Sequence, residues 1–245
     1  MAKISVIIPA FNEELRLPKT LDSVYEYMES RSGNGDDFEV LVVDDGSADD
    51  TCGYVEEYSK AHPKARVIRY PSNRGKGYAV RVGMLEAQGD FRIYNDADGS
   101  SPIEEIEKLL LKMEEGVDIA FGSRAKPDDS RKVDALAYRK YMGNTFNLIV
   151  QALVLPGIHD TQCGFKMFSA ASAKDIFSVA KEDGFAFDVE ILCIARLRKY
   201  KIEEVPINWS NVDGSKVNVL IDSPKMFLQV LNVALGKWTG RYKQD

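Results

Sequence analysis

Two aspartates one residue apart are the most conspicuous candidate for chemistry in this chain. Asp96 and Asp98 follow Phe91–Tyr94, a half-apolar run with strand character, and Gly99 and Pro102 then predict a turn. Open α/β sheets bind their ligands at the carboxyl ends of strands. Two carboxylates about 4 Å apart repel each other by roughly 1 kcal/mol in water, and a divalent cation turns that repulsion into attraction. Because oxygen ligands favour hard ions, we expect Asp96 and Asp98 to bind Mg²⁺ or Mn²⁺.

An Asp-x-Asp pair alone is weak evidence for a metal site, since surface turns are rich in aspartate. Other predicted strands, however, also end in polar loops. Apolar runs of strand length cover Ile4–Ile8, Phe38–Val43 and Val117–Gly122, and each is followed by Asp, Glu, Asn or Arg. Strands and helical patterns alternate through this half, which predicts an α/β fold with a mostly parallel twisted sheet. The loops should therefore meet the Asp96/Asp98 loop at one edge of the sheet.

A glycine-rich turn, Asn73–Ala79, precedes a predicted helix. A Gly-Lys-Gly turn at a helix start offers free backbone N–H groups, a positive dipole end and the ammonium of Lys76, a combination that suits a phosphate. The turn is not a dinucleotide fingerprint, because Val80 occupies the position of the third glycine. A glycine turn with a solvated lysine is the alternative interpretation.

The elements that must position these loops can be traced along the chain. A third strand is expected over Arg66–Tyr70 and an edge strand over Glu203–Ile207. Helical spacing predicts further helices from Leu15, over 50–61 and 103–113, from Tyr138 to Val154, over Phe187–Tyr200 and over Pro224–Trp238. Lys126–Asp134 is expected to be a polar loop and Gly157–Phe168 a loop that passes into a strand. With no repeat and no linker, we expect one domain over residues 1–245.

The composition excludes several classes of protein. The 245 residues are 44% hydrophobic and 29% charged, as in soluble globular domains, and no apolar run approaches the ~18 residues of a membrane span. The first residues lack the pattern of a signal peptide, so we expect a cytoplasmic protein. Three widely spaced cysteines argue against a zinc site or a disulfide framework, and a net charge of −6 argues against binding nucleic acid.

Taken together, the motifs resemble one enzyme family. The inverting family-2 glycosyltransferases of GT-A fold carry motifs similar, in order and spacing, to Ser5–Glu13, Val42–Ser47, Asn73–Ala79 and Asp96–Asp98. Within that family the later segments resemble the dolichyl-phosphate β-glucosyltransferases more than the mannose-phosphate enzymes; these segments are Gly122–Arg124, Asp160–Lys166, Phe187–Glu190 and Asn208–Lys216. The resemblance covers nearly the whole chain.

The resemblance implies a nucleotide-sugar donor, UDP-glucose, a polyprenyl or dolichyl phosphate acceptor, and Mg²⁺ or Mn²⁺. It implies a nucleotide-sugar pocket formed by Pro9, Phe11, Glu13, Val42, Asp44, Lys76, Asp96 and Ala97. Asp44 would accept a hydrogen bond from the nucleotide base, and Asp98 would be the main metal ligand. Arg124 and Arg139 would hold the acceptor phosphate, and Lys216 would reach the donor diphosphate from a mobile loop. Residues 1–124 would then bind the donor and residues 125–223 the acceptor.

The chain departs from its relatives at three places. Where the mannose-phosphate enzymes carry an arginine and a glutamine, this chain has the segment Trp209–Gly214 and Ser100, which leaves the sugar and a third metal contact open. The glucosyltransferases usually begin with a membrane-spanning helix that this chain lacks, so attachment to the membrane should be peripheral or through a partner protein.

In residues 224–245, an apolar stripe flanked by basic residues suits a membrane surface; packing on the same domain or on a second subunit is the alternative. The stripe is Phe227, Val230, Leu231, Ala234 and Trp238.

The expected chemistry needs little from the protein. A phosphate acceptor is already anionic, so in-line positioning and metal stabilisation of the departing UDP would suffice. An acceptor hydroxyl on a sugar or protein would instead need a base such as Asp160 or Asp188, and His159 lies beside Asp160 in the same loop. A non-catalytic nucleotide-sugar-binding module, a third reading, should have lost a metal carboxylate or Lys76, and neither is missing.

Overall fold

The computed structural model describes residues 3–32, 37–128, 132–134, 137–212 and 219–242. For residues 137–142, 144 and 219–223 it describes the backbone alone. Seven strands form the main sheet in the order β3-β2-β1-β4-β7-β5-β8, and two short strands, β6 and β9, pair in parallel beside it. The strands are β1 (Lys3–Ala10), β2 (Asp37–Asp44), β3 (Ala65–Arg69), β4 (Phe91–Asn95), β5 (Ile119–Ser123), β6 (Val133–Asp134), β7 (Phe165–Ser169), β8 (Ile202–Pro206) and β9 (Trp209–Ser210).

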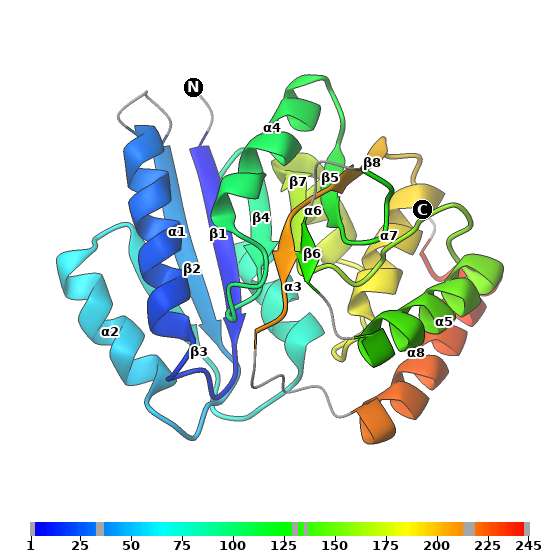
Figure 1. Ribbon diagram of the computed structural model, residues 1–245, viewed down its shortest axis with the longest axis horizontal. Helices are drawn as coiled ribbons and strands as arrows, with labels where there is room; N and C mark the ends of the chain where they lie inside the picture. Colours follow the sequence, from blue (N-terminus) through cyan, green and yellow to red (C-terminus); the bar gives the residue numbers. More distant parts are fainter. Residues whose placement is uncertain (1–2, 33–36, 129–131, 135–136, 213–218, 243–245) are drawn as a thin grey trace.

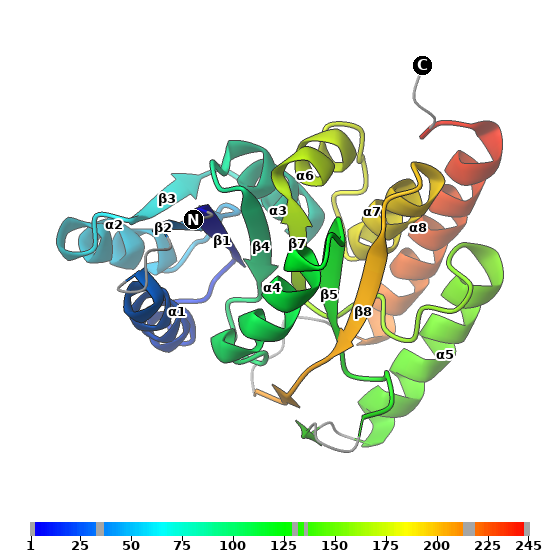
Figure 2. The ribbon, with the colours of Figure 1, turned by 90° about the horizontal axis from the view of Figure 1, so that it is seen from above.

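Helices cover both faces of the sheet (Figures 1 and 2). They are α1 (Leu17–Ser32), α2 (Thr51–Ala61), α3 (Lys76–Glu86), the 3₁₀ turn η1 (Ile103–Glu105), α4 (Ile106–Glu114), α5 (Ala137–Leu153), α6 (Ala170–Phe177), α7 (Phe187–Leu197) and α8 (Val219–Thr239). Along β1, Val6 and Ile8 pack against α1, α2 and α4, whereas Ile7 packs on the opposite face with the other helices. This alternation explains why apolar residues occupy successive positions of β1 from Val6 to Ala10, since both of its faces are buried.

The predicted convergence of loops is confirmed. The strands β1, β2, β4 and β5 run in the same direction, so the loops after Ala10, Asp44, Asn95 and Ser123 leave one edge of the sheet. The strand β7 is antiparallel to both β4 and β5 and therefore begins at that edge. Its approach is close, because the Asp96 N–H donates to the Gly164 carbonyl at 3.1 Å. A loop from the second half of the chain thus lies beside the paired aspartates.

Four elements differ from the sequence prediction. Helix α6 was not predicted; it is only eight residues long and begins at Ser169, whose side chain accepts from the Ser172 N–H. The strands β6 and β9 have two residues each, too few to show a pattern, and β6 lies in the segment expected to be a loop. Helix α8 begins at Val219, whereas the sequence predicts a start at Pro224. Proline fits the first turn of a helix best, but here it is tolerated a few residues further in.

Candidate active site

The two aspartates of the predicted metal site lie at the edge of the sheet and have different partners. Asp98 is half-buried, and its Oδ1 accepts from the Ser100 N–H at 3.0 Å. Asp96 forms an ion pair with Lys76, with 2.6 Å between Nζ and Oδ1. Gly164 packs directly against the Asp96 carboxylate, since a Cβ on this glycine would lie 2.1 Å from Oδ2. Asp96 is therefore held in place on two sides.

This donor set fits Mg²⁺ or Mn²⁺. Burial raises the pKa of Asp96, and the charge of Asp98 adds to that rise while Lys76 opposes it. A divalent cation would relieve this destabilised charge. Among the residues that the structure describes, no group of three or more His, Cys, Asp or Glu side chains is arranged to hold a metal ion. Two carboxylates are nevertheless enough for a cation that takes its other ligands from water and substrate phosphates.

The loop that carries Lys76 corrects one sequence expectation. Its backbone N–H groups were expected to be free for a phosphate, but protein acceptors use those of Arg74, Gly75 and Gly77. The N–H groups of Arg74 and Gly75 donate to the two Asp45 carboxylate oxygens at 2.9 and 2.7 Å. The Gly77 N–H donates to the Asp183 carbonyl at 2.8 Å. The ammonium of Lys76 is thus the group of this loop that faces the aspartate pair. Burial lowers its pKa, but the charges of Asp96 and Asp188 outweigh that effect and raise it.

The two glycines of this loop allow it to pack against the segment before α7. Gly75 has φ +111°, a conformation that side chains rarely adopt, and a Cβ there would lie 2.3 Å from the Asp183 carbonyl oxygen. A Cβ on Gly77 would lie 2.4 Å from the Glu182 carbonyl oxygen. The Gly-x-Gly pattern therefore serves close backbone packing, which in turn places Lys76 at Asp96.

Asp44, the expected acceptor for the nucleotide base, has an unsatisfied oxygen. The residue is fully buried, and its Oδ1 accepts from the Ser47 N–H at 3.1 Å. Within the described part of the chain Oδ2 has no hydrogen-bond partner, and the nearest cation, Arg69 Nε, is 3.6 Å away. A buried acceptor without a donor is costly, so an N–H of a bound base would be favourable here.

The other predicted nucleotide-pocket residues surround the same edge. Pro9 is buried at the end of β1, Phe11 is half-buried in the following loop, and Glu13 forms an ion pair with Arg16. The side chains of Val42 and Ala97 lie in the hydrophobic core on the α1 side of the sheet. Their contact with a nucleotide stays a prediction.

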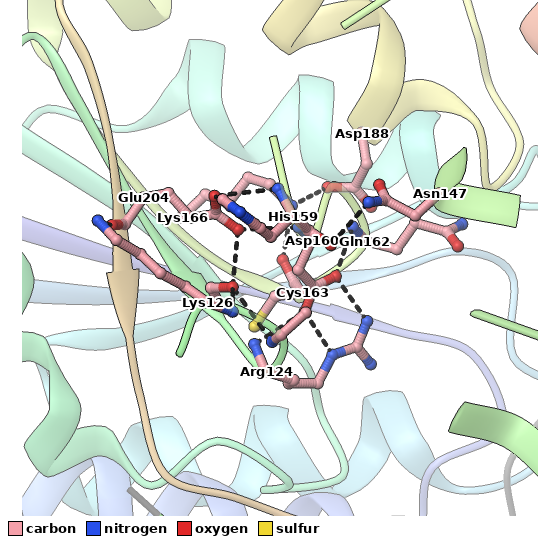
Figure 3. A network of polar contacts seen from close by, with 12 residues as sticks. Arg124, Lys126, Asn147, His159, Asp160, Gln162, Cys163, Lys166, Asp188 and Glu204 are labelled. Atoms are coloured by element: carbon pink, nitrogen blue, oxygen red, sulfur yellow. Dashed lines mark hydrogen bonds and ion pairs between the residues drawn. The ribbon is translucent and has the colours of Figure 1, made fainter. Parts of the chain in front are cut away.

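On the opposite side of the aspartates, Arg124 is already paired. Its Nε and Nη2 donate to the two carboxylate oxygens of Asp160 at 2.7 and 2.9 Å (Figure 3). Its guanidinium lies 5.4 Å from the Trp209 ring centroid. Burial acts to lower the pKa of Arg124, but the charge of Asp160 outweighs the effect of burial, so the pKa is raised above its ordinary value. Burial also disfavours the Asp160 charge, but Arg124 holds the pKa of Asp160 below its ordinary value.

Glu204 on β8 supports the loop that carries Asp160, and sequence reasoning missed it. Its Oε1 accepts from the Ser123 hydroxyl at 2.7 Å and from the Asp160 N–H at 2.8 Å. Its Oε2 accepts from the His159 N–H at 3.0 Å and lies 2.9 Å from Nδ1 of the same residue. The His159 ring therefore faces Glu204 and takes part in anchoring the loop.

Lys166 is the second residue that sequence reasoning missed. It is the second residue of β7, and its side chain is fully buried. Its Nζ donates to the Cys163 carbonyl at 2.6 Å and forms an ion pair with Asp188 (Figure 3). The Tyr94 hydroxyl donates to the same Asp188 oxygen. The only sequence signal was a lysine inside the apolar run Phe165–Phe168.

Two predicted phosphate-binding residues lie beyond what the structure describes in full. Arg139 is in the first turn of α5, where the backbone alone is described, and Lys216 falls outside the described residues. Val212, four residues before Lys216, lines a pocket of about 300 Å³ together with Asp98 and Arg16. The roles of Arg139 and Lys216 stay predictions.

Comparisons with known proteins identify the family. The profile of "Glycosyl transferase family 2" matches residues 5–177. The dolichyl-phosphate β-glucosyltransferase of Homo sapiens is 36% identical over 253 residues, which span 99% of this chain and 78% of the human protein. The enzyme of the same name from Dictyostelium discoideum is 36% identical over 96% of this chain and 76% of its own length.

A solved structure confirms the GT-A fold. Glucosyl-3-phosphoglycerate synthase from Mycobacterium tuberculosis, crystallised with Mn²⁺, UDP and phosphoglyceric acid, superposes with a TM-score of 0.70 at 22% identity. The match covers 96% of this chain and 78% of the mycobacterial chain. With this fold, a family profile over most of its length and relatives above one-third identity, the chain belongs to glycosyl transferase family 2 and is a glycosyltransferase.

Proposed function

We propose that this enzyme transfers glucose from UDP-glucose to a polyprenyl phosphate such as dolichyl phosphate, with Mg²⁺ or Mn²⁺. The curated relatives are named for this acceptor and sugar, and the mycobacterial structure carries Mn²⁺ and UDP. The proposal goes further than these similarities in its choice of acceptor, for which the site itself supplies an argument.

The main support for a phosphate acceptor is that both candidate general bases, Asp160 and Asp188, are paired with cations. A hydroxyl acceptor requires a general base whose pKa lies near the working pH. Asp160 is held in two-point contact by Arg124, which lowers its pKa, and Asp188 is paired with the buried Lys166. Neither carboxylate is arranged to take up a proton. A phosphate acceptor needs no proton removed before it attacks, so this site suits it.

Each group of the site then has a defined task. Asp96 and Asp98 would hold the metal ion, which would stabilise the negative charge of the departing UDP. The ammonium of Lys76, already beside Asp96, would neutralise part of the donor diphosphate, and Asp44 Oδ2 would accept from the base. Arg124 and the first turn of α5, which carries Arg139, would receive the acceptor phosphate.

The acceptor lipid also requires a membrane surface, and α8 is the helix that supports this part of the proposal. Among the residues that the structure describes, no helix is long and apolar enough to cross a bilayer. The predicted stripe on α8 is divided, because Val230 and Ala234 are buried in the core. The exposed apolar face, here called the α8 face, consists of Phe227, Leu228, Leu231, Leu235 and Trp238.

The charge around the α8 face suits an anionic surface. Lys225, Lys237 and Arg241 lie on this helix or just after it, and the sequence from Pro224 to Tyr242 contains no acidic residue. Exposed apolar residues with basic neighbours are typical of helices that lie in the headgroup layer. Figures 1 and 2 show α5 and α8 side by side at the end of the molecule opposite β3. We infer peripheral attachment through this end.

Donor and acceptor can be tested together. Purified protein is incubated with Mn²⁺, a total lipid extract and each of several radiolabelled nucleotide sugars, and the label in the organic phase is counted. We expect label to enter the lipid fraction from UDP-glucose and to require the metal. Label that enters lipid from another nucleotide sugar would overturn the donor assignment, and label found only in water-soluble products would overturn the acceptor assignment.

A further inference from the structure

We propose that Lys166 is a positioning residue that joins the donor side and the acceptor side of the site through one buried ammonium. The inference rests on the proposed function, because it concerns how the metal and the donor diphosphate are bound. The side chain of Lys166 has no exposed surface, and it acts through Asp188 and Cys163.

The surroundings of Lys166 leave its ammonium dependent on a few partners. In the register of the sheet it lies between Tyr94 on β4 and Phe121 on β5, and its Nζ is 5.5 and 6.0 Å from the centroids of these rings. The side chain has no exposed surface, and that of Asp188 is 4% exposed. A buried charge must be paired and hydrogen-bonded, and here Asp188 and the Cys163 carbonyl do this.

On the donor side, charges alternate from Lys166 to the metal site. Lys166 is paired with Asp188, and Lys76 is paired with Asp96. The two pairs lie close together, because a Cβ on Gly77, the residue after Lys76, would lie 2.6 Å from the Cβ of Phe187, the residue before Asp188. Without Lys166, Asp188 would be an uncompensated anion close to Lys76. The ammonium that should meet the donor diphosphate would then be drawn toward Asp188.

On the acceptor side, the same ammonium fixes the loop that enters β7. Its bond to the Cys163 carbonyl lies next to Gly164, whose carbonyl accepts from the Asp96 N–H. Three residues before Cys163 is Asp160, the partner of Arg124 (Figure 3). Together with Glu204, Lys166 therefore holds the loop behind Arg124, and it also balances the charge behind Lys76.

Loss of the Lys166 charge should have opposite effects on the binding of the cation and of the diphosphate. Loss of the Lys166 charge makes the region of Asp96 and Asp98 more negative, so a cation should bind at least as tightly and a diphosphate more weakly. Loss of the Asp188 charge should weaken cation binding instead. Simple damage to the fold would weaken both ligands together. The sign of the two changes thus separates positioning from general structural support.

The test compares wild type, Lys166→Met, Asp188→Asn and the double variant. Mn²⁺ binding without nucleotide is measured by electron paramagnetic resonance, and UDP binding at saturating Mn²⁺ by calorimetry. We expect Lys166→Met to weaken UDP on the order of tenfold without weakening Mn²⁺, and Asp188→Asn to weaken Mn²⁺ several-fold. The double variant, which again has no unpaired charge, should return toward wild type for both ligands. Lys112→Met, at an exposed ion pair on α4, is the matched control.

The outcomes separate the inference from the proposed function. Equal weakening of both ligands by Lys166→Met, or a double variant no better than that single variant, would overturn the positioning role. If Lys166→Met does not fold, the decision falls to Asp188→Asn and the double variant: unchanged Mn²⁺ binding by the first, or no recovery in the second, overturns the role. Failure of the wild type to bind Mn²⁺ and UDP would instead contradict the proposed function.

Discussion

At the level of single residues, the two aspartates of the metal site are not equivalent. Asp96 is bound to Lys76 and confined by Gly164, whereas the described contact of Asp98 is one loop N–H. Asp98 can therefore change its charge at little cost to the fold. It is the better place to test the metal without disturbing the loop.

We predict that Asp98→Asn removes most of the activity and leaves the thermal stability nearly unchanged. An asparagine oxygen can still accept from the Ser100 N–H, but the charge that binds the metal is lost. The measurement is glucosyl transfer at saturating Mn²⁺ together with a melting curve. Glu114→Gln, an exposed substitution on α4, controls for the loss of one negative charge. Turnover close to wild type in Asp98→Asn would argue against a metal role for this residue.

Gly164 gives a second prediction at this scale. Gly164→Ala should raise the apparent Kd for Mn²⁺ on the order of tenfold, because the new Cβ would occupy the position of the Asp96 carboxylate, 2.1 Å from its oxygen. Gly143→Ala is the matched control, since nothing lies within 4 Å of its Cβ and it is in helix α5. Equal Mn²⁺ affinity in the two variants would show that Asp96 does not need this space.

At the level of elements, the loop before β7 is held by Glu204, by Lys166 and by the Arg124–Asp160 ion pair, and the contribution of this ion pair should respond to pH. Because the pKa of Asp160 is lowered in the fold, its contribution to stability is present above the ordinary value of 3.8 and is lost as the pH falls through the folded value. We predict that Asp160→Asn lowers the free energy of unfolding by about 2 kcal/mol at pH 7, because Arg124 loses its ion pair with the carboxylate but is partly solvated.

The difference between wild type and Asp160→Asn should shrink as the pH falls below 3.8, where the carboxyl is protonated first in the unfolded and then in the folded wild type. Urea unfolding at a series of pH values measures it. Glu114→Gln is again the control and should show no such change. A difference that stayed constant down to pH 3 would contradict the proposed stabilisation by Asp160.

Elements with strong patterns could be predicted from the sequence, and those defined by tertiary contacts could not. The buried strands β1 and β2 are continuous apolar runs, and the Asp96/Asp98 loop follows a recognisable strand and turn. The antiparallel direction of β7 leaves no such mark, because strand direction depends on which neighbours pair with it. For the same reason Lys166 and Glu204 were missed, since their partners Asp188 and Asp160 are distant in the sequence.

At the scale of the whole molecule, the proposed attachment to a membrane surface depends on the α8 face. We predict that the chain floats with anionic liposomes and that replacing Leu228, Leu235 and Trp238 with serine lowers the bound fraction at least about tenfold, since each buried side chain contributes roughly 1.5–3 kcal/mol. Serine at Leu85 and Leu111, exposed on other helices, is the control. Unchanged flotation, with a dimer that dissociates in the triple variant, would assign the face to a second copy of the chain.

The proposed function requires that the acceptor of the glucosyl group is a phosphate. The most direct measurement supplies the enzyme with UDP-[¹⁴C]glucose, Mn²⁺ and one of two matched lipids, a polyprenyl phosphate or the same polyprenol with a free hydroxyl, and follows the labelled lipid. With Asp160 and Asp188 both occupied by cations, we predict glucosylation of the phosphate and none of the alcohol. Transfer to the polyprenol at a comparable rate would show that a general base is at work and would contradict the account.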